Sequence, residues 1–198
     1  MRGGISAATR LAMKAPAVSA LRALLPLAAL ILAASLSGCE QGKQAPADKS
    51  AEAAAPGTID RSHKGSQLPD FTVKDRSGKE LKLASLKGKP FLINLWATWC
   101  GPCVAELPQL DRLGAKPRVV TISQDLGNPD KVEAFLKARG GTRLQAWLDP
   151  ENELAFHYEA QTLPTTIYYD AEGREVWRLS GAHDWDSAET AEWLAEAK

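Results

Sequence analysis

The apolar stretch FLINLW at residues 91–96 restricts the fold more than any other part of this 198-residue sequence. Its residues are almost continuously apolar, whereas a strand with one face in water alternates apolar and polar side chains. The stretch therefore predicts a strand that is covered on both faces and lies in the middle of a sheet. The sequence ATWCGPC follows it directly.

The residues around this strand alternate between strand-like and helix-like patterns. After the cysteines, residues 104–113 place an apolar side chain every third residue, which predicts a helix. Residues 71–75 and 80–83 predict a β-hairpin at the start of the folded part. Further strands are expected at 118–123, 144–148, 165–169 and 175–179, and further helices at 129–138, from 149–150 onward and at 187–197. This order predicts an α/β fold, a mixed central sheet with helices on both faces.

The first 38 residues have the composition of a secretory signal. They contain four basic residues and no acidic one, followed by an apolar run at 23–36. That run is shorter than the roughly 20 residues that cross a bilayer as a helix. Met13 is a second candidate start of translation.

Removal of residues 1–38 leaves 20 basic against 24 acidic residues. The net charge of −4 does not favour a nucleic-acid partner.

Residues 40–66 are rich in Ala, Pro, Gly and charge and contain no aromatic side chain. Such a segment buries too little apolar surface to offset the entropy lost on folding. We therefore expect a signal at 1–38, residue 39 with a disordered tether up to 66, and one folded domain at 67–198.

Cys100 and Cys103 can transfer electrons, bind a metal or close a turn. They lie where the central strand meets the following helix, with Cys100 near the helix N-terminus and Pro102 in the first turn. A helix N-terminus stabilises a thiolate, so the pKa of Cys100 is expected below that of a free thiol. Cys100 is the predicted nucleophile, and Cys103 the thiol that resolves a mixed disulfide.

Alternatives to thiol chemistry depend on the other ligands that the chain offers. Structural zinc needs four ligands, and the three histidines are widely spaced, so no metal is expected. A disulfide that merely closes such a short loop removes little chain entropy. A Cu(I) carrier stays open, because two thiolates suit that ion.

Three segments carry a resemblance to a known family. FLINLWATWCGPCVAELPQL, TLPTTIYYDAEGREV and GAHDW resemble the thioredoxin superfamily and, within it, the TlpA/ResA-like thiol-disulfide oxidoreductases of the bacterial envelope. The resemblance covers residues 67–198. It implies a thioredoxin fold with an N-terminal β-hairpin and a central strand-helix insertion. It also implies that a redox-active Cys100–Cys103 disulfide serves in place of a bound cofactor.

The resemblance also assigns roles to residues near the cysteines. Pro164 is expected to follow Leu163 through a cis peptide bond and to expose the main chain of Leu163 to the substrate. The residues expected to contact the substrate are Trp99, Gly101, Pro102 and Leu163. Glu106 matches a glutamate that acts as proton acceptor in this group, and it follows Cys103 by one helical turn. Asn94, at the position of the buried aspartate of thioredoxin, does not titrate.

Partners and location also follow from resemblance. The residues LSGC at 36–39 resemble a lipobox, which implies lipidation of Cys39 and a periplasmic protein anchored to the inner or the outer membrane. The substrates would be disulfide-containing envelope proteins, such as apocytochrome c or the copper-site cysteines of cytochrome oxidase assembly. A membrane reductase of the DsbD/CcdA type would supply electrons.

The direction of electron flow is predicted from the dipeptide between the cysteines. Gly101-Pro102 is the dipeptide of thioredoxin, a reductant with a potential of about −270 mV, so reduction is favoured over a disulfide oxidase or isomerase on the same scaffold. A peroxidase would need Pro at 93 and Thr or Ser at 97, where the chain has Ile93 and Ala97.

Overall fold

The computed structural model describes residues 57–114 and 117–197. The predicted signal, Cys39 and most of the predicted tether lie outside these residues, so those parts of the predicted domain organisation stay predictions. Across the described ranges, no helix combines the length and the apolar composition that a membrane crossing needs.

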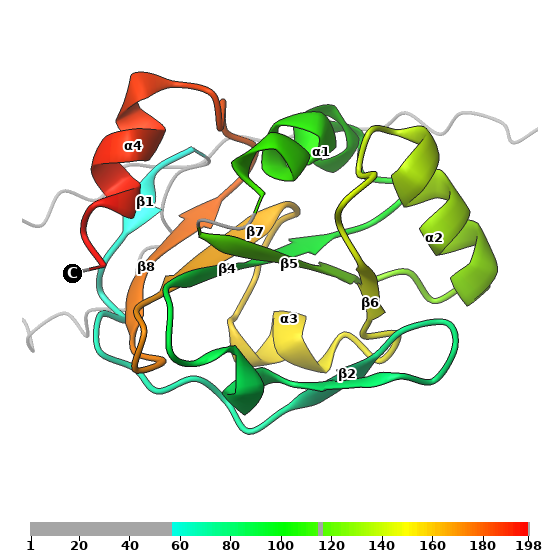
Figure 1. Cartoon of the computed structure of the whole chain (residues 1–198), viewed down its shortest axis with the longest axis horizontal. Helices are drawn as coiled ribbons and strands as arrows, with labels where there is room; N and C mark the ends of the chain where they lie inside the picture. Colours follow the sequence, from blue (N-terminus) through cyan, green and yellow to red (C-terminus); the bar gives the residue numbers. More distant parts are fainter. Residues whose placement is uncertain (1–56, 115–116, 198) are drawn as a thin grey trace, which may run out of the picture. The chain divides into compact units, whose positions relative to one another are not determined.

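A mixed sheet of eight strands forms the centre of the domain (Figure 1). The strands are β1 (Ile59–Asp60), β2 (Thr72–Lys74), β3 (Glu80–Lys82), β4 (Phe91–Trp96), β5 (Arg118–Ser123), β6 (Ala146–Leu148), β7 (Thr165–Tyr169) and β8 (Glu175–Ser180). Their order across the sheet is β1-β8-β7-β4-β5-β6-β2-β3. β4 pairs in parallel with β5 and antiparallel with β7, so the continuously apolar strand lies inside the sheet, as predicted.

Helices cover both faces of this sheet. They are α1 (Gly101–Leu113), α2 (Pro129–Ala138), α3 (Glu153–His157) and α4 (Ala188–Leu194), with a 3-10 turn η1 (Leu83–Leu86). Figure 1 shows α1 and α2 on one side of the sheet and α3 on the other. The hairpin β2–β3 is present and extends the sheet beyond β6. The predicted α/β class and thioredoxin fold are therefore confirmed.

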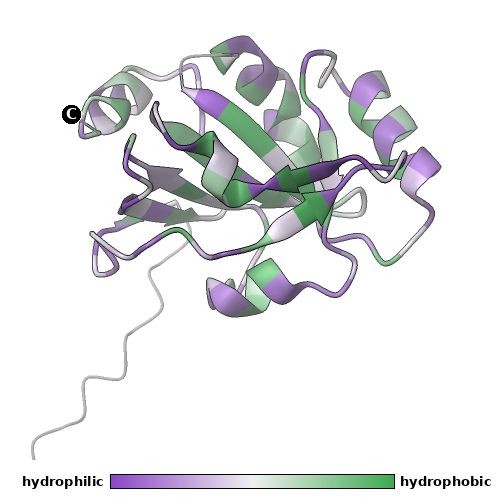
Figure 2. Cartoon of the chain, turned by 60° about the horizontal axis from the view of Figure 1, so that its bottom comes forward, coloured by the Kyte–Doolittle hydropathy of each residue, from purple (hydrophilic) through white to green (hydrophobic). Residues whose placement is uncertain are grey.

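The alternation of side chains along β4 divides the core into two clusters. Leu92 and Trp96 join the cluster under α1, α2 and α4, which also contains Leu107, Leu136 and Trp177. The residues that point to the opposite face of the strand belong to the second cluster, with η1 and α3; they are Phe91, Ile93 and Leu95. Figure 2 shows hydrophobic residues concentrated in the central strands and hydrophilic residues in the loops. Every side chain of β4 is thus buried.

Residues 57–66 differ from the prediction of a disordered tether. Ile59 and Asp60 form β1, which pairs with Leu179 and Arg178 of β8, and Arg61 forms an ion pair with Glu196. The folded part therefore begins before residue 67. The cause is main-chain pairing with an exposed strand edge, which needs few apolar side chains.

Several predicted elements are shorter than expected. β6 begins at Ala146 rather than at 144, α3 begins at Glu153 rather than at 149–150, and α4 ends at Leu194 rather than at 197. Asn152, directly before α3, has a left-handed backbone with φ 58°. It separates the turn at 149–151 from the helix, which accounts for the late start of α3.

The buried carboxylate of Asp111 ties α1 to the loop before β6. It accepts hydrogen bonds from the main-chain N–H groups of Arg143 and Leu144, at 2.7 and 3.1 Å. Burial by itself would raise the pKa of Asp111, but these bonds, together with those from the Arg143 and Thr142 side chains, hold that pKa below its usual value. The helix that carries the cysteines is thereby fixed to the segment that leads into β6.

Candidate active site

The cysteines lie where β4 passes into α1. Cys100 is the N-cap residue of α1, and its sulfur accepts a hydrogen bond from the Cys103 N–H at 3.2 Å. Gly101 and Pro102 lie in the first turn of the helix. N–H groups in the first turn have no partner within the helix, so the missing N–H of proline costs no hydrogen bond there. The helix begins at Gly101, so Pro102 and Cys103 both lie in the first turn of α1, as predicted.

Cys100 and Cys103 form a disulfide with a Cα–Cα distance of 5.3 Å. Cys100 is 6% exposed and Cys103 is 0% exposed. Trp99, immediately before them, is 71% exposed. An attacking sulfur from another molecule therefore reaches Cys100 more readily than Cys103.

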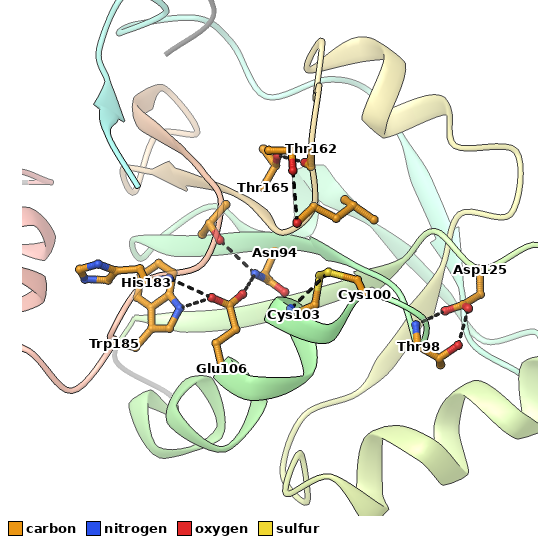
Figure 3. Close-up of a disulfide and its surroundings, with 12 residues drawn as sticks. Asn94, Thr98, Cys100, Cys103, Glu106, Asp125, Thr162, Thr165, His183 and Trp185 are labelled. Atoms are coloured by element: carbon orange, nitrogen blue, oxygen red, sulfur yellow. Dashed lines mark hydrogen bonds between the residues drawn. A yellow bond between two sulfur atoms is a disulfide. The ribbon is translucent and has the colours of Figure 1, made fainter. Parts of the chain in front are cut away.

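Glu106 lies on α1, one turn after Cys103, and is only 3% exposed. Its Oε1 accepts a hydrogen bond from the Asn94 side-chain amide at 2.9 Å. Its Oε2 accepts one from the Trp185 indole N–H at 3.0 Å and a longer one from the His183 main-chain N–H at 3.4 Å. Figure 3 shows the carboxyl group held between Asn94 and Trp185, beside the disulfide.

Two opposing effects set the acidity of Glu106. Burial disfavours its charged form and raises its pKa to about 7, against an ordinary value of 4.5. The bonds from Trp185, Asn94 and His183 favour the charged form and lower the pKa, but by less. The group can therefore take up or release a proton near neutral pH.

Asn94 links the carboxyl group of Glu106 to β7, the strand that follows Pro164. Its side-chain N–H group also donates to the Thr166 hydroxyl at 3.0 Å, while its side-chain oxygen, Oδ1, is buried and has no hydrogen-bond partner in the described part of the chain. Asn94 therefore positions Glu106 and does not itself exchange a proton.

The Leu163–Pro164 peptide bond is cis. It lies directly before β7, where the Pro164 carbonyl accepts from the Gly181 N–H at 2.8 Å and the Thr165 hydroxyl donates to the Thr162 carbonyl at 2.7 Å. Leu163 contacts both core clusters and lines the same groove as Cys100. The structure thus brings the two segments with the strongest resemblance together.

A second polar network supports the loop before the cysteines. The carboxylate of Asp125 accepts hydrogen bonds from the Thr98 N–H at 2.9 Å and the Thr98 hydroxyl at 2.6 Å (Figure 3). It also accepts one from the Ser123 hydroxyl at 2.7 Å. These bonds fix the residues between the end of β4 and the start of α1.

A groove of 960 Å³ opens beside Cys100. One wall consists of Trp99 to Pro102 and the other of residues from α3 and the segment that leads to Leu163. All four residues predicted to contact a substrate line it: Trp99, Gly101, Pro102 and Leu163. Glu106 lies outside it, in a smaller cavity with Pro102 and His183.

Several residues of the site were not predicted from the sequence. Trp185 belongs to the quoted segment GAHDW, but no role was assigned to it, because the contact between its indole and Glu106 spans 79 residues. Asp125 and Gln124 follow β5 at the carboxyl end of a parallel strand, a place where functional side chains gather in α/β sheets. That position was the signal that could have found them.

Comparison with known proteins connects this geometry to a family. Residues 64–176 match the family model described as the AhpC/TSA family. The chain is 34% identical over 121 residues to the thiol-disulfide oxidoreductase ResA of Geobacillus kaustophilus, and the match covers 59% of this chain and 69% of that protein. It is 31% identical over 120 residues to ResA of Bacillus anthracis, with the same coverage. The chain belongs to the AhpC/TSA family, as a TlpA/ResA-like member of the thioredoxin superfamily.

Solved structures agree with this assignment. A thiol:disulfide interchange protein of the thioredoxin family from Chlorobium tepidum has a TM-score of 0.56 and 25% identity, covering 68% of this chain and 97% of that one. The exposed lipoprotein thioredoxin Etrx1 of Streptococcus pneumoniae has a TM-score of 0.53 and 28% identity, covering 65% of this chain and 99% of that one. The TlpA/ResA-like protein is a thiol-disulfide oxidoreductase.

Within residues 57–114 and 117–197, no cluster of three or more His, Cys, Asp or Glu side chains could hold a metal ion.

The raised pKa of Glu106 predicts a pH-dependent stability. Because its folded pKa of about 7 lies above the ordinary 4.5, the stabilisation is complete below pH 4.5 and is lost as the pH rises through about 7. The loss amounts to about 3 kcal/mol. We expect Glu106→Gln to remove this slope in urea unfolding of the oxidised protein.

The control is Glu151→Gln, at an exposed glutamate on the turn before α3, which should keep the wild-type slope. An unchanged slope in Glu106→Gln would contradict the description of Glu106 as a buried acid with a raised pKa.

Proposed function

We propose that this oxidoreductase reduces disulfides of envelope proteins through Cys100 and Cys103, with Glu106 as the proton acceptor. The observation that supports the proposal most directly is the buried carboxyl group of Glu106 one turn beyond the buried Cys103. A thiol without access to water needs a nearby base before it can attack as a thiolate.

The proposed reaction proceeds in two exchanges. The Cys100 thiolate attacks one sulfur of the substrate disulfide, and the other sulfur leaves as a thiolate. Cys103 then gives its proton to Glu106 and attacks the Cys100 sulfur, which releases the second substrate sulfur. Two electrons pass to the substrate, and the Cys100–Cys103 disulfide remains. Cys100 is suited to the first exchange by its N-cap position and its greater exposure.

In this proposal the substrate lies in the groove beside the cysteines. Trp99, Gly101 and Pro102 contact it from one side and Leu163 from the other, where Pro164 directs the main chain of Leu163 toward the substrate. The exposed indole of Trp99 supplies apolar contact area.

The reductive direction, the partners and the location complete the proposal. The thioredoxin dipeptide Gly101-Pro102 favours reduction, and a membrane reductase of the DsbD/CcdA type would restore the dithiol. We place the protein in the periplasm, anchored to the inner or the outer membrane through a lipid on Cys39. Apocytochrome c and the copper-site cysteines of cytochrome oxidase assembly are the proposed substrates.

Trapping of mixed disulfides tests the order of the two exchanges. We expect Cys103→Ser to accumulate mixed disulfides with envelope proteins, because Cys100 attacks and nothing resolves the product. Cys100→Ser is the matched control and should trap few. The measurement is non-reducing electrophoresis of the purified variants, followed by identification of the attached proteins. Equal trapping by both variants, or trapping by Cys100→Ser alone, would contradict the assignment.

The pH dependence of the second exchange tests Glu106. In the wild type, release of reduced substrate from Cys100 should rise with pH through about 7, as Glu106 becomes able to accept a proton. Glu106→Gln should slow this step at neutral pH and remove the inflection near pH 7. The measurement is stopped-flow fluorescence of reduced protein mixed with a disulfide peptide. If the inflection persists in Glu106→Gln, another group accepts the proton.

A further inference from the structure

Gln124 is a buried side chain without hydrogen-bond partners. The residue is 3% exposed, yet neither its side-chain oxygen nor its side-chain nitrogen has a partner in the described part of the chain. A buried amide left unpaired costs free energy, so such groups are uncommon in native proteins. Its main-chain N–H is satisfied by the Trp96 carbonyl at 2.8 Å.

The position of Gln124 connects it to the active site. It directly follows β5, the parallel neighbour of β4, and so lies at the carboxyl ends of two parallel strands. It also lines the groove that contains Cys100. A molecule in this groove would lie next to Gln124, whose buried amide would offer it one donor group and one acceptor group after turning toward the groove.

Each of the two walls of the groove carries an exposed aromatic side chain. Phe156 of α3 is 79% exposed and lines the groove, as does Trp99 with 71%. Leu126 is equally exposed, at 79%, but does not line it. Among the described residues that line the groove, Glu159 is the only charged one. The groove therefore offers two exposed aromatic rings, a buried amide and almost no charge.

These features fit one occupant, an extended polypeptide. A peptide group carries one N–H donor and one carbonyl acceptor, which is what the side-chain amide of Gln124 can satisfy. Covalent attachment of a substrate sulfur to Cys100 places the residues beside that sulfur in the groove. An apolar side chain there would cover the rings of Trp99 and Phe156, which otherwise face water.

We infer that Gln124 binds the main chain of the substrate segment next to its reactive cysteine, and that Trp99 and Phe156 hold an apolar side chain of that segment. Gln124 is a binding residue, which contacts the substrate polypeptide away from the reacting sulfurs. The inference rests on the proposed reductase function and adds a preference for polypeptide disulfides flanked by apolar residues.

Two disulfides of different chemistry test the role of Gln124. One is a short peptide closed by a disulfide with Leu beside each cysteine, and the other is hydroxyethyl disulfide, which has no peptide group. Prereduced protein is mixed with each, and tryptophan fluorescence gives the two second-order rate constants. We expect Gln124→Met to lower the ratio of the peptide rate to the small-disulfide rate about 5- to 10-fold, the effect of about one hydrogen bond.

Gln124→Met should also be at least as stable as the wild type, because it removes an unpaired buried amide. The matched control is Gln145→Met, at an exposed glutamine outside the groove, which should keep the wild-type ratio.

Phe156 and Leu126 form a second matched pair, since both are 79% exposed and only Phe156 lines the groove. The wild type should react faster with the Leu peptide than with the same peptide carrying Ser beside each cysteine. Phe156→Ser should lose this preference, and Leu126→Ser should keep it.

The possible results separate the inference from the function. If the wild type reduces neither disulfide, the proposed reductase function is wrong. If the wild type reduces both but Gln124→Met keeps the wild-type ratio, or slows both disulfides equally, the inference fails while the function stands. A selective loss on the peptide in Gln124→Met, together with a lost Leu preference in Phe156→Ser, supports the inference.

Discussion

The complete burial of β4 is the constraint on which the rest of the site depends. A strand that is apolar on both faces needs a helix layer on each side, and the structure supplies α1, α2 and α4 on one face and η1 and α3 on the other. After this covered strand ends at Trp96, a short loop leads into α1, so Cys100 caps a helix whose own position is fixed by the core. The N-terminal field of α1 therefore acts on a sulfur that is held in one place.

The same burial determines the behaviour of Glu106. Asn94 is a polar residue inside β4, on the face toward α1, and it is tolerated there because its amide donates both to Glu106 and to Thr166. Burial raises the pKa of the carboxyl group, while three N–H donors moderate the effect. The pKa of Glu106 thus lies near neutral pH because desolvation and hydrogen bonding oppose each other. The contributing residues come from β4, α1 and the segment before α4.

The sequence contained enough information for the architecture and for the centre of the site. The continuous apolar run of β4 and the periodicity of α1 are local features, so they could be read directly, and they placed Cys100 and Cys103 at the correct junction. Contacts between distant segments could not be read in this way. The bond from Trp185 to Glu106, the network of Asp125 and the pairing of β1 with β8 all depend on tertiary geometry. Residues 57–66 were predicted to belong to the disordered tether because that prediction used composition alone. Their order comes from main-chain pairing, which composition does not reveal.

The equilibrium potential of the Cys100–Cys103 couple tests the account most directly. It can be titrated against glutathione in the isolated protein and followed by tryptophan fluorescence, since Trp99 lies beside the disulfide. A reductant that is maintained by electrons from the membrane predicts a potential of about −250 mV or lower. A potential of about −120 to −180 mV would contradict the account, because a couple in that range oxidises or isomerises its substrates.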